Sequence, residues 1–319
     1  MTINLITRDY TYWNGILSRA ENYINIISKE FERGVKWKEE IPLVQLKIDW
    51  SENFEGPKIT RIDNCCYIIL RLGFIKWLDD FVIEMQEHLG SNNGFCLNNG
   101  DNDISEWVLY TWLSWFIEHE LGHLFCGHYV GKTQEWYDWK EIDFKSLNNN
   151  IRLSFEYDAD MFASEKFFSG LAYAMKQSNK LQGFGDKYFS DMGFICFVLF
   201  SLLERIDPDP QSHPKLSDRL SMFMLRGFKV YEIELNKNVQ KELRAFALGI
   251  YQAVQSIGEE GQEFFNKMMQ FNSEKFVSSC KCLIEKKYHL RRMYNMKHDW
   301  VKDIKNMFIK PEKFTQNKI

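Results

Sequence analysis

Apolar residues recur every three or four positions over most of this chain, and few residues interrupt the pattern. Only 6 Pro and 18 Gly occur in 319 residues. Helical spacing of apolar side chains gives a helix one face to bury, whereas turn-dense β-sandwiches need many more breakers. Because 45% of the residues are hydrophobic and 16% are aromatic, a large core can be filled. We therefore expect a globular, mostly helical chain of one large domain or two lobes.

A short β-rich region interrupts the predicted helices near the N-terminus. Residues 41–50 alternate between apolar and polar, and residues 59–72 are rich in β-forming side chains around a turn at 63–64. Predicted helices cover residues 11–34, 74–89, 104–126, 151–175, 188–206, 215–226, 237–257 and 273–308. The pattern predicts a mainly α (α+β) fold with a small N-terminal β-sheet.

Cysteine usage and charge narrow the class of protein. The seven Cys include no CxxC pair, which argues against a disulfide framework or a thiolate zinc site and favours reduced thiols. The N-terminus has no apolar signal-peptide region, and the longest apolar run, residues 193–203, is too short to span a bilayer. The formal net charge of -4 argues against a chain that binds nucleic acid over its whole surface. We expect a cytoplasmic protein without a membrane span.

The predicted helix 104–126 carries an HExxH motif at residues 119–123. Residues four apart share a helix face, so His119 and His123 can bind one metal ion. Zinc lowers the pKa of a bound water to about 7, and the adjacent Glu120 can then take its proton. The motif arises by chance in about one such chain in a hundred. The alternative is a buried helix whose two His are simply hydrogen-bonded.

The next predicted helix offers a third ligand. Glu156 and Asp160 are again four apart, so one can bind the metal while the other holds the second ring nitrogen of a ligand His. We assign the first role to Glu156 and the second to Asp160, against the alternative of an ordinary acidic face. His128 is closer in sequence, but on a continuing helix it would lie about 180° from His119. We therefore interpret His128 as a residue that supports the ligands or the structure, and not as a ligand.

A third element completes a recognisable pattern. HExxH, then ExxAD at residues 156–160, then HPxxxxR at residues 213–219 resembles the gluzincin metallopeptidases, most of all the HtpX and CaaX-prenyl-protease type. The sequence HELGHxxxGH, in an α-rich chain of this size, is also similar to the family of the bacterial phage-exclusion peptidase Lit. These resemblances imply a zincin-like helical catalytic core and a Zn²⁺-dependent cytoplasmic endopeptidase. The second also implies a role in phage exclusion (abortive infection), with a host translation factor as substrate.

The same resemblance gives expectations for the remaining site residues. It implies that His213 lies beside the metal, as an extra ligand or as a catalytic donor to the oxyanion; Tyr157 is another candidate donor. The alternative for His213 is that it caps the next helix together with Pro214. Arg219 is expected to be structural, bound to Asp160 or Asp158.

With the motifs placed, we expect three parts along the chain. Residues 1–103 form an N-terminal helix and small sheet packed on the core, residues 104–230 the zinc-peptidase core, and residues 231–319 a C-terminal helical region. An extended substrate could add as a strand to the edge of residues 43–48 or 59–70.

The last 45 residues differ in charge from the rest. Residues 275–319 contain 12 Lys+Arg and 4 Asp+Glu, a net charge of +8, which leaves -12 for the preceding residues. We expect this basic helix to dock on the acidic body; RNA binding is the weaker alternative. A further alternative for the whole protein is a peptidase-like regulatory, toxin or sensor module that acts by binding proteins.

Overall fold

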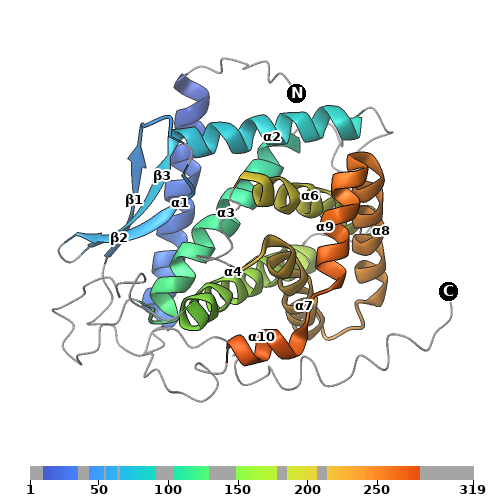
Figure 1. The fold of residues 1–319 in the computed structure, drawn as a ribbon. Helices are drawn as coiled ribbons and strands as arrows, with labels where there is room; N and C mark the ends of the chain where they lie inside the picture. The colour runs from blue at the N-terminus through green and yellow to red at the C-terminus, as the bar shows by residue number, and fades with distance from the viewer. Residues whose placement is uncertain are drawn as a thin grey trace. The chain divides into compact units, whose positions relative to one another are not determined.

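The computed structural model describes residues 10–34, 43–53, 55–62, 65–90, 104–128, 149–177, 185–206 and 214–280. The prediction of a mainly helical fold with a small N-terminal sheet is confirmed (Figure 1). The chain divides into two compact units, residues 1–140 with 292–295 and residues 141–291 with 296–319, and each is described by itself. The expected three-part division stays a prediction.

The first unit combines a three-stranded sheet with helices. Its described elements are α1 (Tyr10–Gly34), β1 (Leu43–Asp49), β2 (Lys58–Ile62), β3 (Cys65–Arg71), α2 (Leu72–Gly90) and α3 (Ile104–Phe125). The strand order is β1-β3-β2, with β1 parallel and β2 antiparallel to β3. Within this unit, β1 contacts α1, β2 contacts α3, and α2 packs on α3 (Figure 1).

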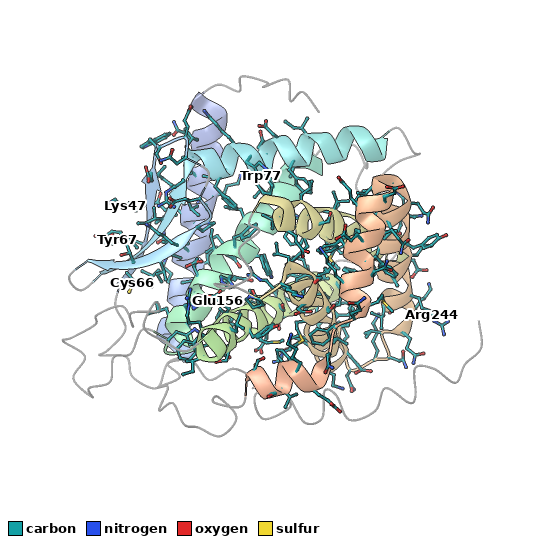
Figure 2. All side chains as sticks on the ribbon, in the orientation of Figure 1. Lys47, Cys66, Tyr67, Trp77, Glu156 and Arg244 are labelled. Carbon is teal, nitrogen blue, oxygen red and sulfur yellow. The ribbon has the colours of Figure 1, made fainter. Side chains whose placement is uncertain are left out.

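β3 is the central strand, and its side chains alternate in burial. Cys66, Ile68 and Leu70 are buried, whereas Tyr67 and Ile69 are half-buried, which follows from the two-residue period of a strand. Figure 2 labels Cys66 and Tyr67 of this strand. Because β3 is paired on both sides, it has no free edge. The expectation that residues 59–70 offer an edge is therefore wrong for 65–70 and holds only for β2.

In the described part of the second unit, every regular element is a helix. The elements are α4 (Asn149–Gln177), α6 (Gly185–Ile206), α7 (Leu216–Leu235), α8 (Gln240–Ile257), α9 (Glu259–Met269) and α10 (Ser273–Ser279). α6 packs along α8 and α4 along α7, while α9 contacts α7 and α8. Phe168 of α4 lies against Phe223 and Phe228 of α7, so aromatic rings fill this helix interface. Among the described helices, none has the length and apolarity needed to cross a bilayer.

Two helix predictions differ from the structure. The helix predicted to end at residue 226 continues to Leu235. Gly227 lies within it, where a Cβ would meet the Phe168 ring at 2.0 Å. The helix ends instead at Asn236, whose φ of 50° is left-handed. α9 was not predicted at all.

The last predicted helix is only partly described. The predicted start at residue 273 is confirmed, but α10 ends at Ser279. Residues 281–319, which include the rest of this predicted helix, lie outside the described residues, as do residues 91–103 and 129–148.

Candidate metal centre

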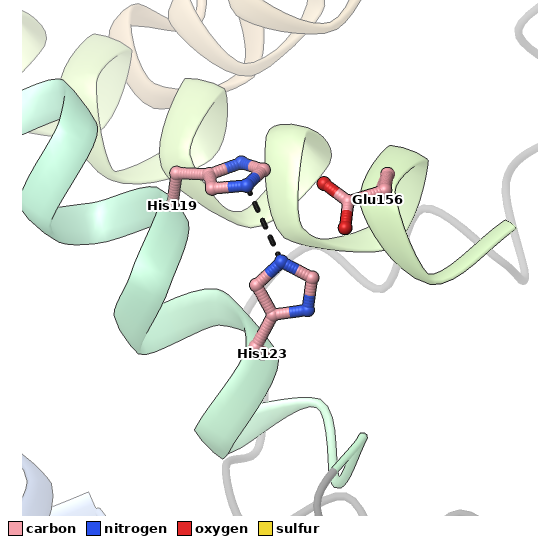
Figure 3. A group of neighbouring side chains, drawn as sticks. All are labelled: His119, His123 and Glu156. Carbon is pink, nitrogen blue, oxygen red and sulfur yellow. Dashed lines mark hydrogen bonds between the residues drawn. The ribbon is translucent and has the colours of Figure 1, made fainter. Parts of the chain in front are cut away.

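The two histidines of the HExxH motif lie on the same face of α3, as their spacing predicts. His119 and His123 are both buried, with exposed fractions of 6% and 5%. Their Nε2 atoms are 3.3 Å apart, and their rings meet edge to face (Figure 3). Two nitrogens at this distance can coordinate one ion, and the same distance fits a hydrogen bond between the two rings.

Aromatic packing explains why α3 holds these polar side chains in the interior. Trp112 and Trp115 are almost fully buried, and the ring of Trp115 lies beside that of His119. Phe116 meets Phe74 of α2 edge to face. Because α3 is packed by α1 and α2, the imidazoles are set on a rigid element, which a binding site requires.

Glu120 differs from the histidines in being only half-buried. Its Oε2 accepts a hydrogen bond from the backbone N–H of Ile59 in β2, at 2.9 Å. Glu118, two residues before Glu120, is buried and accepts a hydrogen bond from the Tyr23 hydroxyl of α1. Neither partner was predicted from the sequence, because both come from elements remote in the chain. The Glu120 carboxylate is thus held by the edge of a strand.

His128 does not follow the geometry assumed from the sequence. α3 ends at Phe125, so the argument from a continuing helix is wrong. His128 is fully buried, and its Nδ1 lies 3.0 Å from Nδ1 of His123. Gly127, with a φ of 85°, was the available signal, since a glycine after a helical run marks a helix end that reverses direction.

In the second unit, α4 carries the acidic residues of the ExxAD segment. Glu156 and Asp160 are both buried. Arg219 of α7 donates two hydrogen bonds to Asp160, from Nε to Oδ2 at 2.8 Å and from Nη2 to Oδ1 at 2.6 Å. The expected pairing of Arg219 with an acidic residue is confirmed, and Asp160 is its partner. That Asp160 also orients a ligand His stays a prediction.

Tyr157 and Asp218 form a second polar pair between α4 and α7. Burial raises the pKa of the Tyr157 hydroxyl, and the nearby charge of Asp218 raises it further, so the hydroxyl stays protonated. Burial also raises the pKa of the Asp218 carboxyl, which is hydrogen-bonded to Tyr157. The Tyr157 ring meets Phe276 edge to face. As an oxyanion donor, Tyr157 would have to share a hydroxyl already bonded to Asp218.

The described residues include a donor set suited to a divalent metal. His119 and His123 in the first unit and Glu156 in the second are each buried, and imidazole nitrogens and carboxylate oxygens are donors that a divalent metal takes (Figure 3). Three ionisable groups in the interior are costly unless something pairs with them. His213, the other predicted site residue, lies outside the described residues.

Comparison with known proteins gives one match. The model of the family Peptidase U49 matches residues 79–239, which is half of the chain and includes the HExxH helix, α4 and α7. No curated protein and no solved structure matches the chain. The predicted resemblance to the Lit family is confirmed by this match. The chain belongs to the Peptidase U49 family and is a peptidase.

Proposed function

We propose that this peptidase is a zinc-dependent endopeptidase, with Zn²⁺ held by His119, His123 and Glu156. The observation that carries the proposal is the facing pair of imidazole nitrogens on the HExxH helix of a peptidase-family chain. In a tetrahedral zinc site with Zn–N bonds of 2.0–2.1 Å, two nitrogen ligands lie about 3.3 Å apart. The Nε2 atoms of His119 and His123 are separated by 3.3 Å.

The choice of Glu156 as third ligand rests on chemistry and motif order. A carboxylate completes the two-His-one-carboxylate set of catalytic zinc sites, which leaves one position open. Glu156 is buried, and it begins the ExxAD segment. We assign Asp160 to orienting a ligand His and His213 to the oxyanion or the resting metal site. Arg219, through its ion pair, holds Asp160 in place.

Glu120 is the general base and acid in this proposal. When bound, the ion would lower the pKa of a water molecule and polarise the scissile carbonyl. Glu120 takes a proton on its carboxylate and later gives it to the nitrogen of the leaving amine, so the carboxylate is regenerated. Its half-buried position supports this role, because a carboxylate that exchanges protons with a substrate must be reachable.

The substrate is proposed to be a polypeptide that adds to the outer edge of β2. β2 pairs with β3 on one side only, and Ile59 directs its N–H away from β3, to Glu120. In an antiparallel pair the outward N–H and C=O groups come from alternate residues, so Arg61 offers the next outward pair. A substrate strand bound there would pass close to Glu120.

For the biological setting we propose a cytoplasmic protease of phage exclusion that cleaves a host translation factor. Membership of Peptidase U49 supports this, together with the resemblance of its HELGHxxxGH segment to the Lit family. Cys66, Cys126, Cys196 and Cys280 are buried cysteines, and we propose that they stay reduced in the cytoplasm.

The metal and the reaction are tested together with one substitution. Wild type purified under reducing conditions should carry about one zinc per chain, and Glu120→Gln should keep the metal while losing proteolysis. Terminal-peptide proteomics of cells that express each form should find a cleavage present only with wild type. A wild type without metal would overturn the zinc site. Equal terminal peptides in both cell lines would favour the alternative that the protein acts by binding.

A second arm tests the ligand assignment. Glu156→Ala should weaken zinc binding far more than replacement of His128, because only Glu156 is a ligand in this proposal. The reverse order would exclude Glu156 from the ligand set.

A further inference from the structure

The end of α3 turns the chain back onto its own last turn. Gly127 has a φ of 85°, its N–H donates to Leu124 O at 3.1 Å, and the N–H of His128 donates to His123 O at 2.9 Å. These two hydrogen bonds form the Schellman pattern of a helix that stops at a left-handed glycine. The His128 side chain is therefore brought beside His123 rather than around to the far face.

The contact between the two rings uses a specific atom of each. Nδ1 of His123 and Nδ1 of His128 are 3.0 Å apart, with the ring planes at 71°. The other nitrogen of His123, Nε2, faces Nε2 of His119. His123 thus divides its two nitrogens between separate partners, with Nδ1 toward His128 and Nε2 toward His119.

We propose that His128 is a positioning residue that fixes His123 in the tautomer able to bind metal through Nε2. The Nδ1–H of His123 donates to Nδ1 of His128, which accepts through its lone pair and carries its own proton on Nε2. The lone pair of His123 Nε2 is then free for a metal. This inference rests on the proposed function and deepens it, since it assigns a role to a residue outside the ligand set.

The burial of His128 protects its contact with His123 from competing water. With none of its surface exposed, His128 is shielded from water that could replace it as the acceptor for His123. The second nitrogen of a metal-binding His usually meets a carboxylate, carbonyl or water, and loss of that partner lowers metal affinity by about 10- to 100-fold. Here an imidazole fills that place, delivered by the turn at Gly127.

Two substitutions separate hydrogen bonding from packing. His128→Phe keeps a ring but has no acceptor, whereas His128→Asn offers a carbonyl oxygen near the position of Nδ1. Zinc affinity, measured by competition with a chromophoric chelator, should fall about 10- to 100-fold in the Phe variant and be largely restored in the Asn variant. Phe125→Leu, in the same turn, is the control: it disturbs packing but removes no partner of His123, so affinity should stay near wild type.

A second measurement needs no variant and no metal. In the metal-free wild type at mildly alkaline pH, ¹⁵N-histidine NMR should show His123 protonated on Nδ1 and unprotonated on Nε2. The opposite tautomer would overturn the inference, as would equal zinc affinities of the Phe and Asn variants. If wild type binds no zinc, the proposed function fails, while the tautomer of His123 still decides the inference about His128.

Discussion

At the scale of single residues, the buried pair of Asp160 and Arg219 ties α4 to α7. The two side chains are 3% and 12% exposed and share two hydrogen bonds. Arg219→Ala would leave the Asp160 carboxylate buried without its counter-ion, and breaking such a pair costs about 3 kcal/mol. We expect that loss in the free energy of unfolding measured with denaturant.

Lys229→Ala provides a matched control for that prediction. Lys229 lies on the same helix and pairs with Glu232, but both side chains are well exposed. An exposed pair contributes less than about 1 kcal/mol. If the two variants lose equal stability, Arg219 does not have the structural role assigned to it.

Asp218 should make the stability of the fold depend on pH with the opposite sign to most carboxylates. Burial raises its pKa in the folded state, and Glu204 adds to the rise, while Lys215 and Lys275 oppose it. As pH increases from the ordinary pKa of an Asp through this raised value, the unfolded chain binds fewer protons than the folded one, so stability falls. Asp218→Asn should therefore gain stability relative to wild type between acidic and neutral pH. A constant difference across this range in denaturation experiments would contradict the raised pKa.

At the scale of elements, glycines set the distance between α6 and α8. A Cβ on Gly249 would lie 1.8 Å from Ser190 O, and one on Gly193 would lie 2.1 Å from Phe246 O. Because backbone atoms cannot move aside as a side-chain tip can, Gly249→Ala should cost about 1–3 kcal/mol even though alanine favours helices. Thermal unfolding of the purified variant measures this loss.

Gly170 on α4 offers a control for the Gly→Ala substitution at a position where no other atom would contact the new Cβ. It is exposed, and nothing lies within 4 Å of a Cβ built there. Gly170→Ala should stabilise the protein by about 0.5–1 kcal/mol, through helix propensity alone. A gain at both positions would mean that α6 and α8 pack less tightly than the structure shows.

The sequence predicted most helices because their burial leaves a local pattern, and it failed where the cause was not local. α1, α2, α3, α4 and α6 follow apolar spacing along one segment. The helix predicted over residues 215–226 stopped before Gly227, yet a Cβ at Gly227 would meet the ring of Phe168, which lies 59 residues earlier along the chain in another helix. The parallel pairing of β1 with β3 likewise depends on which strands meet, and alternation alone does not encode that.

The candidate site likewise contains some features that local sequence patterns predict and others that they do not. His119 and His123 share one helix face by spacing, so their positions were predictable. The Ile59 N–H that holds Glu120 comes from 61 residues away, and no side-chain pattern marks a backbone donor. His128 was misplaced because its position depends on where α3 stops, which Gly127 decides.

At the scale of the whole molecule, a bound metal should raise the free energy of unfolding, and the increase should grow with the affinity of the folded chain for the metal. A ligand that binds only the folded state adds about 4 kcal/mol when its free concentration is a thousand times its Kd. Removing zinc with a chelator should therefore lower the melting temperature of wild type. Because His119→Ala lacks an assigned ligand, its melting temperature should hardly change with chelator.

Glu120→Gln completes the comparison, because Glu120 is assigned to proton transfer and not to metal binding. Its Oε1 can still accept the Ile59 N–H, so the contact that Glu120 makes with β2 need not be lost. Chelation should then lower its melting temperature as much as that of wild type. If the Gln variant instead behaves like His119→Ala, Glu120 is a ligand, and the division of the HExxH motif into two ligands and one base is wrong. Scanning fluorimetry with and without added zinc, under reducing conditions, measures all three proteins side by side.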